Sequence, residues 1–357
     1  EITSETRISV SRLLREQADA IGDKTFLLWK GRAFTYEQAN TEVDRIAFAL
    51  LSAGVRPGDH VGVLIEDSPA LLTVSVALNR LGAVVVLYDP AVAPERFEQM
   101  LANYSADKMI VDDRGEHLLD VLTGSPSERI ALASLEHDTG DGVPLEESFE
   151  LDASEANRLG MILFTDDEQA LAVRITNRRW MVAALGAAAG ARLTSSDTVH
   201  CPIACSSASG MLVACGGALA GGSRLALSTP RSASGLLEEV RRYGASVLFY
   251  DRGLLRVLLE AFVEDEEDGA KLPLRAMVGM GVREEEWFAI KHHIPHIEIL
   301  EYFAQPEGPV ILATLTQDAP GSMGRALPGM DGVEVVAFDR ERGTIVRDDQ
   351  GRARGAD

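Results

Sequence analysis

The chain has 357 residues, of which 46% are hydrophobic, and its 55 acidic and 34 basic side chains give a formal net charge of −21. This length suffices for two domains or for one large α/β domain with a sizeable core. The acidic balance disfavours nucleic acid as a partner, and no run of 18 apolar residues indicates a transmembrane segment. Neither a signal peptide nor a lipidation motif is visible, which favours a cytoplasmic protein, with peripheral contact to a membrane as the alternative. The ends at Glu1 and Asp357 suggest a piece of a longer polypeptide.

Strands and helices alternate in the first 111 residues. Apolar spacing predicts helices at residues 9–20, 36–53, 69–81 and 94–104, and strands at 25–29, 33–36, 60–65, 83–87 and 108–111. This alternation predicts βαβ crossovers and a largely parallel sheet with helices on both faces. Residues 112–156 are more irregular and acidic, and we expect them to cross to a second subdomain.

A second α/β pattern follows. It begins with a strand at 161–164 and a helix at 180–193, with an N-cap at Thr176 or Asn177. Further strands are predicted at 198–203, 224–227, 245–250, 274–280 and 297–302, and further helices at 210–219, 233–243 and 284–293. From residue 310 onward, short strands alternate with turns, which is typical of an antiparallel subdomain. The predicted fold is therefore α/β, with parallel-sheet subdomains at 1–155 and 156–308 and the start of a smaller, β-barrel-like antiparallel subdomain at 309–357.

The loop after the strand at 161–164 has an unusual composition. In phosphate-binding loops this position carries glycines, hydroxyl side chains and a lysine, whereas here it carries Asp166, Asp167 and Glu168. A pair of unit charges about 4 Å apart interacts by about 1 kcal/mol in water and about 4 kcal/mol at an effective dielectric constant of 20. Three acids facing a triphosphate would therefore oppose its binding. The alternative interpretation is a solvated acidic turn.

The potential metal ligands are few. The cysteines are Cys201, Cys205 and Cys215. Their spacing matches neither a disulfide framework nor a Cys-x-x-Cys metal motif, so we interpret them as small buried hydrophobic residues in a reducing compartment. A histidine group, His292, His293 and His296, is interpreted as a surface helix end. No metal site is predicted from these residues.

The order of several segments resembles that of a known superfamily. The segments are FTYEQANTEVDRIAFALLSAGVRPGDHVGVLIEDSP, ALNRLGAVVVLYDP, SASGLLEEVRRYGASVLFY, EYFAQPEG and GSMGRALPG. They resemble the adenylate-forming superfamily, most closely the fatty-acid-transport-protein branch of the long-chain acyl-CoA synthetases, from about residue 8 to 355. The resemblance implies a reaction in which a carboxylate and ATP form an acyl-adenylate, from which coenzyme A then displaces AMP. The family's C-terminal lid would lie downstream of Asp357 and is absent from this chain.

The phosphate loop departs from the family pattern. Active members read TSGTTGxPK at this loop. Thr165 matches the first threonine, and Ala172 and Val173 match the residues after the lysine. Six residues, 166–171, stand where the family has eight, so the loop is both shortened and acidic.

The acyl and nucleotide positions depart as well. Ser206 and Ser207, ahead of Gly210, replace an aromatic–histidine pair near the acyl carboxylate. They either widen an apolar pocket or pack the start of a helix. In the segment that contacts nucleotide, Tyr302 and Phe303 exchange the order of the family's aromatics.

The resemblance assigns further residues to the nucleotide site. Pro306 replaces the threonine that contacts the α-phosphate, and proline offers neither hydroxyl nor N–H. Glu307 matches the magnesium-side carboxylate, although it could equally cap backbone donors. Gly279 and Gly281 match the adenine-side turn.

These departures predict an acyl-CoA-synthetase-like domain of lipid metabolism that no longer forms acyl-adenylates. It would serve as an acyl-ligand or protein-interaction module, perform no cofactor chemistry and belong to a longer polypeptide. One alternative is an active fatty-acid–CoA ligase that uses ATP, magnesium and coenzyme A, with Arg174, Arg178 or Arg179 supplying the missing positive charge. Another is a purely structural interaction domain, which would show a filled apolar cavity between the two α/β halves.

Overall fold

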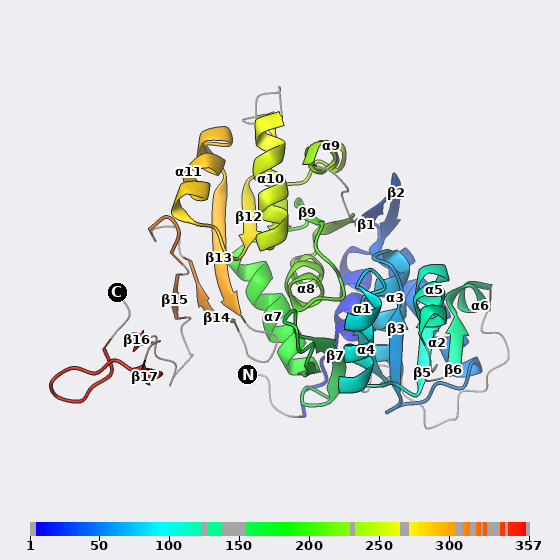
Figure 1. The fold of residues 1–357 in the computed structure, drawn as a ribbon. Coiled ribbons are helices and arrows are strands. Elements are labelled where there is room, and N and C mark those ends of the chain that lie inside the picture. The colour runs from blue at the N-terminus through cyan, green and yellow to red at the C-terminus, as the bar shows by residue number, and fades with distance from the viewer. Residues whose placement is uncertain are drawn as a thin grey trace.

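The computed structural model describes residues 5–122, 128–137, 155–228, 233–264, 271–304, 310–314, 319–322, 324–326, 336–339 and 342–354. Two large sheets with helices between and outside them make up most of this part of the chain (Figure 1). No helix within it has the length and apolar composition needed to cross a bilayer.

The first sheet has six strands in the order β6-β5-β3-β4-β7-β8. These strands are β3 (His60–Leu64), β4 (Val84–Tyr88), β5 (Lys108–Val111), β6 (Glu128–Ala131), β7 (Leu159–Phe164) and β8 (Ala172–Thr176). Neighbouring strands are parallel except for β7 and β8, which pair antiparallel. The carboxyl ends of β3, β4, β5 and β7 therefore meet at one edge.

The second sheet has nine strands in the order β15-β14-β13-β12-β11-β9-β10-β1-β2. They are β1 (Thr25–Trp29), β2 (Arg32–Thr35), β9 (Thr198–Cys201), β10 (Arg224–Leu227), β11 (Val247–Tyr250), β12 (Ala276–Gly279), β13 (Glu298–Ala304), β14 (Val310–Ala313) and β15 (Arg325–Ala326). Its centre is parallel, and its two ends, β2 and β14–β15, are antiparallel. Near the C-terminus, β16 (Phe338–Asp339) and β17 (Thr344–Ile345) form a separate two-stranded sheet.

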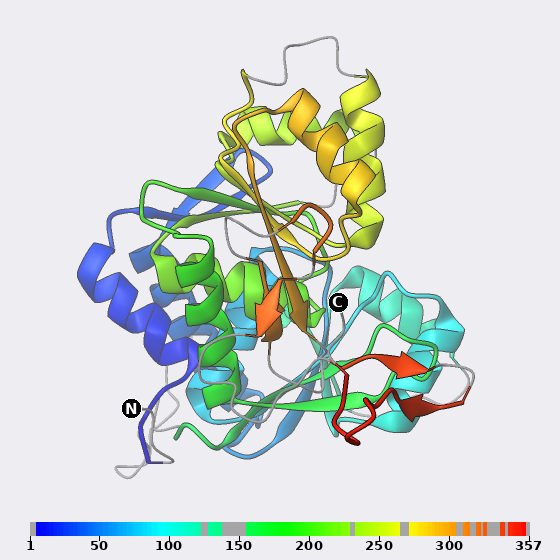
Figure 2. The ribbon, with the colours of Figure 1, turned by 90° about the vertical axis from the view of Figure 1, so that its left-hand side faces the viewer.

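The helices form three layers around the two sheets. They are α1 (Val10–Ile21), α2 (Tyr36–Ser52), α3 (Pro69–Leu81), α4 (Pro94–Asn103), α5 (Asp113–Val121), α6 (Leu132–His137), α7 (Asn177–Gly190), the π-helix η1 (Ser209–Cys215), α8 (Gly216–Gly221), α9 (Ala233–Tyr243), α10 (Arg252–Glu264) and α11 (Glu284–His293). Helices α1, α2, α3, α7, α8 and η1 pack between the sheets, α9–α11 cover the outer face of the nine-stranded sheet, and α4 and α5 cover that of the six-stranded sheet. Figure 2 shows the yellow and orange outer helices at one end of the molecule and the cyan ones at the other.

Side chains of the central strands alternate between these layers, as the twofold period of a strand requires. In β4, Val85 and Leu87 belong to the core between the sheets, whereas Val84 and Val86 belong to the outer core. Because both faces are buried, these strands read as continuous apolar runs. This explains why the sequence predicts them so readily.

The predicted α/β class with a small antiparallel part is confirmed, but three details differ. Residues 113–121 and 128–137 hold α5, β6 and α6 where irregular chain was expected. The described strands after β13 form short antiparallel pairs and no closed barrel. The sheets also exchange strands across residue 155, since β1 and β2 join the later sheet and β7 and β8 the earlier one. The boundaries of the predicted subdomains remain a prediction.

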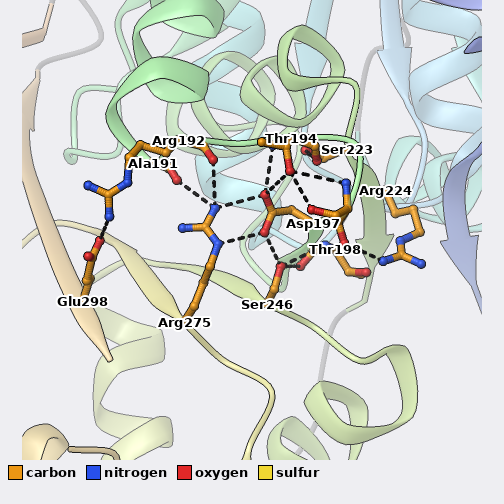
Figure 3. Close-up of polar contacts among 11 residues, drawn as sticks. Ala191, Arg192, Thr194, Asp197, Thr198, Ser223, Arg224, Ser246, Arg275 and Glu298 are labelled. Carbon is orange, nitrogen blue, oxygen red and sulfur yellow. Dashed lines mark hydrogen bonds and ion pairs between the residues drawn. The ribbon is translucent and has the colours of Figure 1, made fainter. Parts of the chain in front are cut away.

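A polar cluster around Asp197 ties the starting ends of β9, β11 and β12 together (Figure 3). Arg275 donates from Nε and Nη2 to the two Asp197 carboxylate oxygens, at 2.8 and 3.1 Å. The Ser246 hydroxyl and the Thr194 amide also donate to this carboxylate, at 2.8 and 2.9 Å. Burial alone would raise the pKa of Asp197, but these donors together lower it. The cluster thus fixes the sheet at the edge opposite the one where its parallel strands end.

Candidate functional site

The acidic loop is the tip of a hairpin. Strand β7 ends at Phe164, β8 returns from Ala172, and the two strands are paired with Phe164 opposite Ala172. The Thr176 hydroxyl accepts a hydrogen bond from the Arg179 amide at 3.2 Å, which confirms the predicted N-cap of α7. The sequence did not predict β8, because five residues between a loop and a cap carry too little periodicity.

The carboxylate of Asp167 closes the loop from inside. Its Oδ1 accepts hydrogen bonds from the Thr165 hydroxyl at 2.7 Å and from the amides of Gln169 and Ala170 at 3.0 and 3.1 Å. The Thr165 hydroxyl in turn accepts from the Leu171 amide at 2.9 Å. The Thr165 hydrogen bond, supported by the two amides, lowers the pKa of Asp167. Hydroxyl and amide groups of the kind that bind phosphate in such loops therefore already hold an anion that belongs to the chain.

Helix α4 supports the outside of the loop. Arg96 donates to the carbonyl oxygens of Thr165 and Asp167 at 2.7 and 2.6 Å. Asn103 donates to those of Gln169 and Ala170 at 2.7 and 3.1 Å. The backbone of the loop is thus held on both sides, with Asp167 within and α4 outside.

Asp166 faces other acids. Loss of solvent around it raises its pKa, Arg96 acts in the opposite direction, and the nearby carboxylates of Asp251 and Asp89 raise it further. Asp89 follows β4 and Asp251 follows β11, so acids from both sheets approach the loop. Glu168 is exposed. The electrostatic environment here disfavours a polyanion.

The glycine turn after β12 also encloses a carboxylate. A Cβ at Gly279 would lie 2.1 Å from the Tyr250 carbonyl oxygen, so this close approach requires glycine, and Gly281 has a positive φ of 97°. The amides of Gly281 and Val282 donate to Glu301 Oε2 at 2.8 and 3.2 Å, and the Tyr250 hydroxyl donates to the same carboxylate. Burial raises the pKa of Glu301.

The residues at the predicted acyl position support a helix start. The Ser207 hydroxyl accepts from the Gly210 amide at 3.0 Å and donates to the Ala204 carbonyl oxygen at 2.8 Å. A Cβ at Gly210 would lie 2.1 Å from that same carbonyl oxygen. Of the two alternatives for the serines, this geometry favours the helix start for Ser207. Ser206 is half-buried beside it.

The two aromatics lie on β13. Tyr302 is buried in the core between the sheets, and burial raises its pKa to about 12, while Phe303 is half-buried. Pro306 and Glu307 lie outside the described residues. Their predicted roles therefore remain predictions.

A cleft of about 1070 Å³ lies between the two sheets. Its wall combines the carboxyl ends of β3 and β4 with β1, β2 and the start of α3. Apolar side chains such as Trp29, Phe34 and Ile65 contribute to the lining, and so do the carboxylates of Asp67 and Asp89. A space of this size is in the range of small-molecule sites.

Comparison with known families and structures agrees with this arrangement. A model of the AMP-binding enzyme family matches residues 14–352. The chain belongs to the AMP-binding enzyme family.

Two relatives and two solved structures illustrate the similarity. The chain is 25% identical to the medium/long-chain-fatty-acid–CoA ligase FadD6 of Mycobacterium tuberculosis, over 98% of this chain and 58% of that protein. It is 24% identical to mouse long-chain fatty acid transport protein 6, over 85% and 51%. The structure of a benzoate CoA ligase from Burkholderia xenovorans has a TM-score of 0.81 at 18% identity, over 97% and 68% of the two chains. The structure of the anthranilate CoA ligase AuaEII with anthranoyl-AMP has a TM-score of 0.79 at 18% identity, over 96% and 67%. The chain thus spans about half to two thirds of these proteins.

Three arginines were considered as an alternative source of positive charge for phosphate binding in this member of the AMP-binding enzyme family. They do not lie at the tip of the acidic loop. Arg174 is exposed on β8 opposite Ile162. Arg178 and Arg179 lie in the first turn of α7, after the end of β8. Strand β8 rises about 3.4 Å per residue, so its end is about 14 Å from the loop. The cation that does contact the loop, Arg96, was missed, because it comes from a helix about seventy residues earlier in the chain.

The structure also brings together three side chains whose spacing in the sequence gave no sign of a cluster. The sulfur atoms of Cys201, Cys205 and Cys215 all lie within 4.8 Å of one another, and all three residues are buried. Their interpretation as buried residues agrees with the structure. Their clustering was not predictable, because the fold of η1 against β9 creates it.

Proposed function

We propose that this chain is an acyl-CoA-synthetase-like domain of lipid metabolism that no longer forms acyl-adenylates. It retains the ligand space between its two sheets for an acyl ligand or a protein partner. The observation that carries the proposal is the Asp167 carboxylate, which accepts hydrogen bonds from the Thr165 hydroxyl and from the amides of Gln169 and Ala170. A triphosphate would have to break these bonds and approach a carboxylate.

The energetic argument has two parts. Each amide that leaves Asp167 for a phosphate exchanges one charge-assisted hydrogen bond for another, so the net gain is small. The displaced carboxylate then lies near the phosphates, and Asp166, Asp89 and Asp251 add further negative charge. Both parts oppose nucleotide binding.

The open cleft supports a small-molecule ligand over a purely structural role. A structural module would fill the space between its α/β halves, whereas here about 1070 Å³ is open and partly apolar. The similarity to fatty-acid–CoA ligases favours an acyl group as that ligand. The alternative, an active ligase that uses ATP, magnesium and coenzyme A, requires a cation at the loop. Arg96 is there, but its guanidinium donates to backbone carbonyl oxygens.

One experiment tests both halves of the proposal. The purified chain is incubated with a long-chain fatty acid, Mg-ATP and coenzyme A, and native mass spectrometry follows bound and released species. We expect bound fatty acid and no acyl-adenylate, AMP or acyl-CoA. Formation of acyl-adenylate would refute the loss of activity, and absence of any bound acyl species would refute the acyl-ligand role.

A matched pair of variants places the ligand. Ala91 is exposed at the lining of the cleft, so Ala91→Trp should narrow the cleft and reduce acyl binding about tenfold. Leu185 is 46% exposed on α7 and does not line the cleft, so Leu185→Trp should leave binding unchanged. Equal acyl binding by both variants would show that the cleft is not the acyl-binding site.

A further inference from the structure

The three cysteines come from three consecutive pieces of structure around one buried point. Cys201 ends β9, Cys205 follows in the connection, and Cys215 ends the π-helix η1. The sulfur atoms of Cys205 and Cys215 are 3.7 Å apart, and all three sulfurs lie within 4.8 Å of one another. These are all of the cysteines in the chain.

The local backbone is built to bring them together. Seven residues of π-helix are uncommon, and π-helical turns are frequent at functional sites. Gly210, inside η1, allows its backbone to approach the Ala204 carbonyl oxygen, because a Cβ there would lie only 2.1 Å away. This contact holds the connection that carries Cys205 against the helix that carries Cys215.

A carboxylate lies next to the group. Asp67, which follows β3 and lies before α3, accepts a hydrogen bond from the Cys205 amide at 3.0 Å. Asp67 also lines the cleft between the sheets, so the cysteine cluster lies next to the wall of that cleft.

The spacing of the sulfur atoms suits a tetrahedral thiolate site. Zinc binds cysteine sulfur at about 2.3 Å, which places two sulfurs of one tetrahedron about 3.8 Å apart. The 3.7 Å between Cys205 and Cys215 already matches this separation. Three thiolates form a donor set that favours Zn²⁺ over Mg²⁺ or Ca²⁺.

We propose that Cys201, Cys205 and Cys215 bind a thiophilic divalent cation, Zn²⁺, beside Asp67 at the wall of the cleft. Binding replaces the protons of the thiols, which pass to solvent, and changes no oxidation state. The charge of the ion offsets the negative charge of the buried thiolates that form on binding. The site is independent of whether the chain adenylates.

Cobalt titration tests the proposal. The chain is reduced, freed of metal with a chelator and titrated anaerobically with Co²⁺, a spectroscopic probe for zinc sites. We expect binding of about one Co²⁺ per chain, a thiolate-to-cobalt charge-transfer band, tetrahedral d–d absorption, and displacement of the cobalt by Zn²⁺. Absence of the charge-transfer band from folded, reduced protein would overturn the proposal. Protein purified without reductant should also keep its full mass. A mass lower by two hydrogens would show that Cys205 and Cys215 form a disulfide, and this result would also overturn the zinc-site proposal.

Variants distinguish the site from adventitious binding. Cys215→Ala should abolish the charge-transfer band. If this variant does not fold, Asp67→Asn keeps all three thiols and an acceptor for the Cys205 amide, and it should weaken Co²⁺ binding about tenfold or more. As a matched control, His292→Ala removes an exposed histidine far from the cysteines and should leave the band unchanged. Unchanged affinity in Asp67→Asn would remove Asp67 from the site.

Discussion

At the residue scale, one side chain distinguishes this loop from a phosphate cradle. Three consecutive acids follow Thr165, and the sequence predicts that together they oppose a polyanion. The sequence could not show that Asp167 turns inward to accept three hydrogen bonds, while Asp166 faces other carboxylates. Nor could the sequence show that Ala170, in the same turn, adopts a positive φ of 46°, which is uncommon for a residue with a side chain.

This asymmetry predicts different behaviour for two adjacent acids. Asp167→Ala removes the carboxylate that accepts from the Gln169 and Ala170 amides, so hydrogen exchange should accelerate roughly two- to tenfold at Gln169. The acceleration should be smaller at Ala170, whose amide keeps a 3.3 Å contact with the Asp167 carbonyl oxygen. Asp166→Asn removes repulsion from Asp89 and Asp251 and should leave exchange at those amides unchanged. NMR or mass spectrometry can measure the amide exchange rates in both variants. Equal acceleration in the two variants would contradict the role of Asp167.

The pH dependence of the loop follows from the pKa of Asp167. Because folding lowers this pKa, the stabilising contribution is complete above the ordinary aspartate value, near pH 4, and is lost as the pH falls through the lowered value. Loop protection in the wild type should therefore be constant from about pH 5 to pH 8, after correction for intrinsic exchange, and should decline only in more acidic solution.

At the element scale, local periodicity predicted most elements but not how they pair. Helix α2 was expected from apolar residues at helical spacing, and its capping box, with Thr35 and Gln38, fixes its start. The pairing of β1 with β10, which joins Leu27 to Leu225, has no local signal, because nearly two hundred residues separate the partners. Helix α10 was missed although it is strongly amphipathic.

The Asp197 cluster should be important for the nine-stranded sheet (Figure 3). Asp197→Asn keeps the shape of the side chain but removes the charge that pairs with Arg275, and should reduce the free energy of unfolding by about 1.5–3 kcal/mol. Glu298→Gln, in the exposed ion pair with Arg192, should leave that free energy nearly unchanged. Chemical denaturation of the two variants measures both, and a similar loss in each would show that the buried position of Asp197 has no special effect.

At the scale of the whole molecule, the α/β architecture of the family surrounds an acidic loop. The apolar strands and the helices between the sheets follow from residue patterns, so the fold was predictable. The cleft and the cysteine cluster were not, because each combines residues from distant segments: Asp67 after β3 and Cys205 after β9 meet only in the folded chain. Sites that depend on such long-range contacts could not be predicted from the sequence.

The central claim is that an internal carboxylate has replaced the bound phosphate at this loop. Calorimetric titration of the chain with Mg-ATP, with amide spectra recorded at each step, tests it most directly. We predict no binding heat at millimolar nucleotide and unshifted Gln169 and Ala170 amides, because Asp167 holds them. Micromolar binding of Mg-ATP accompanied by shifts of these two amides would contradict the account.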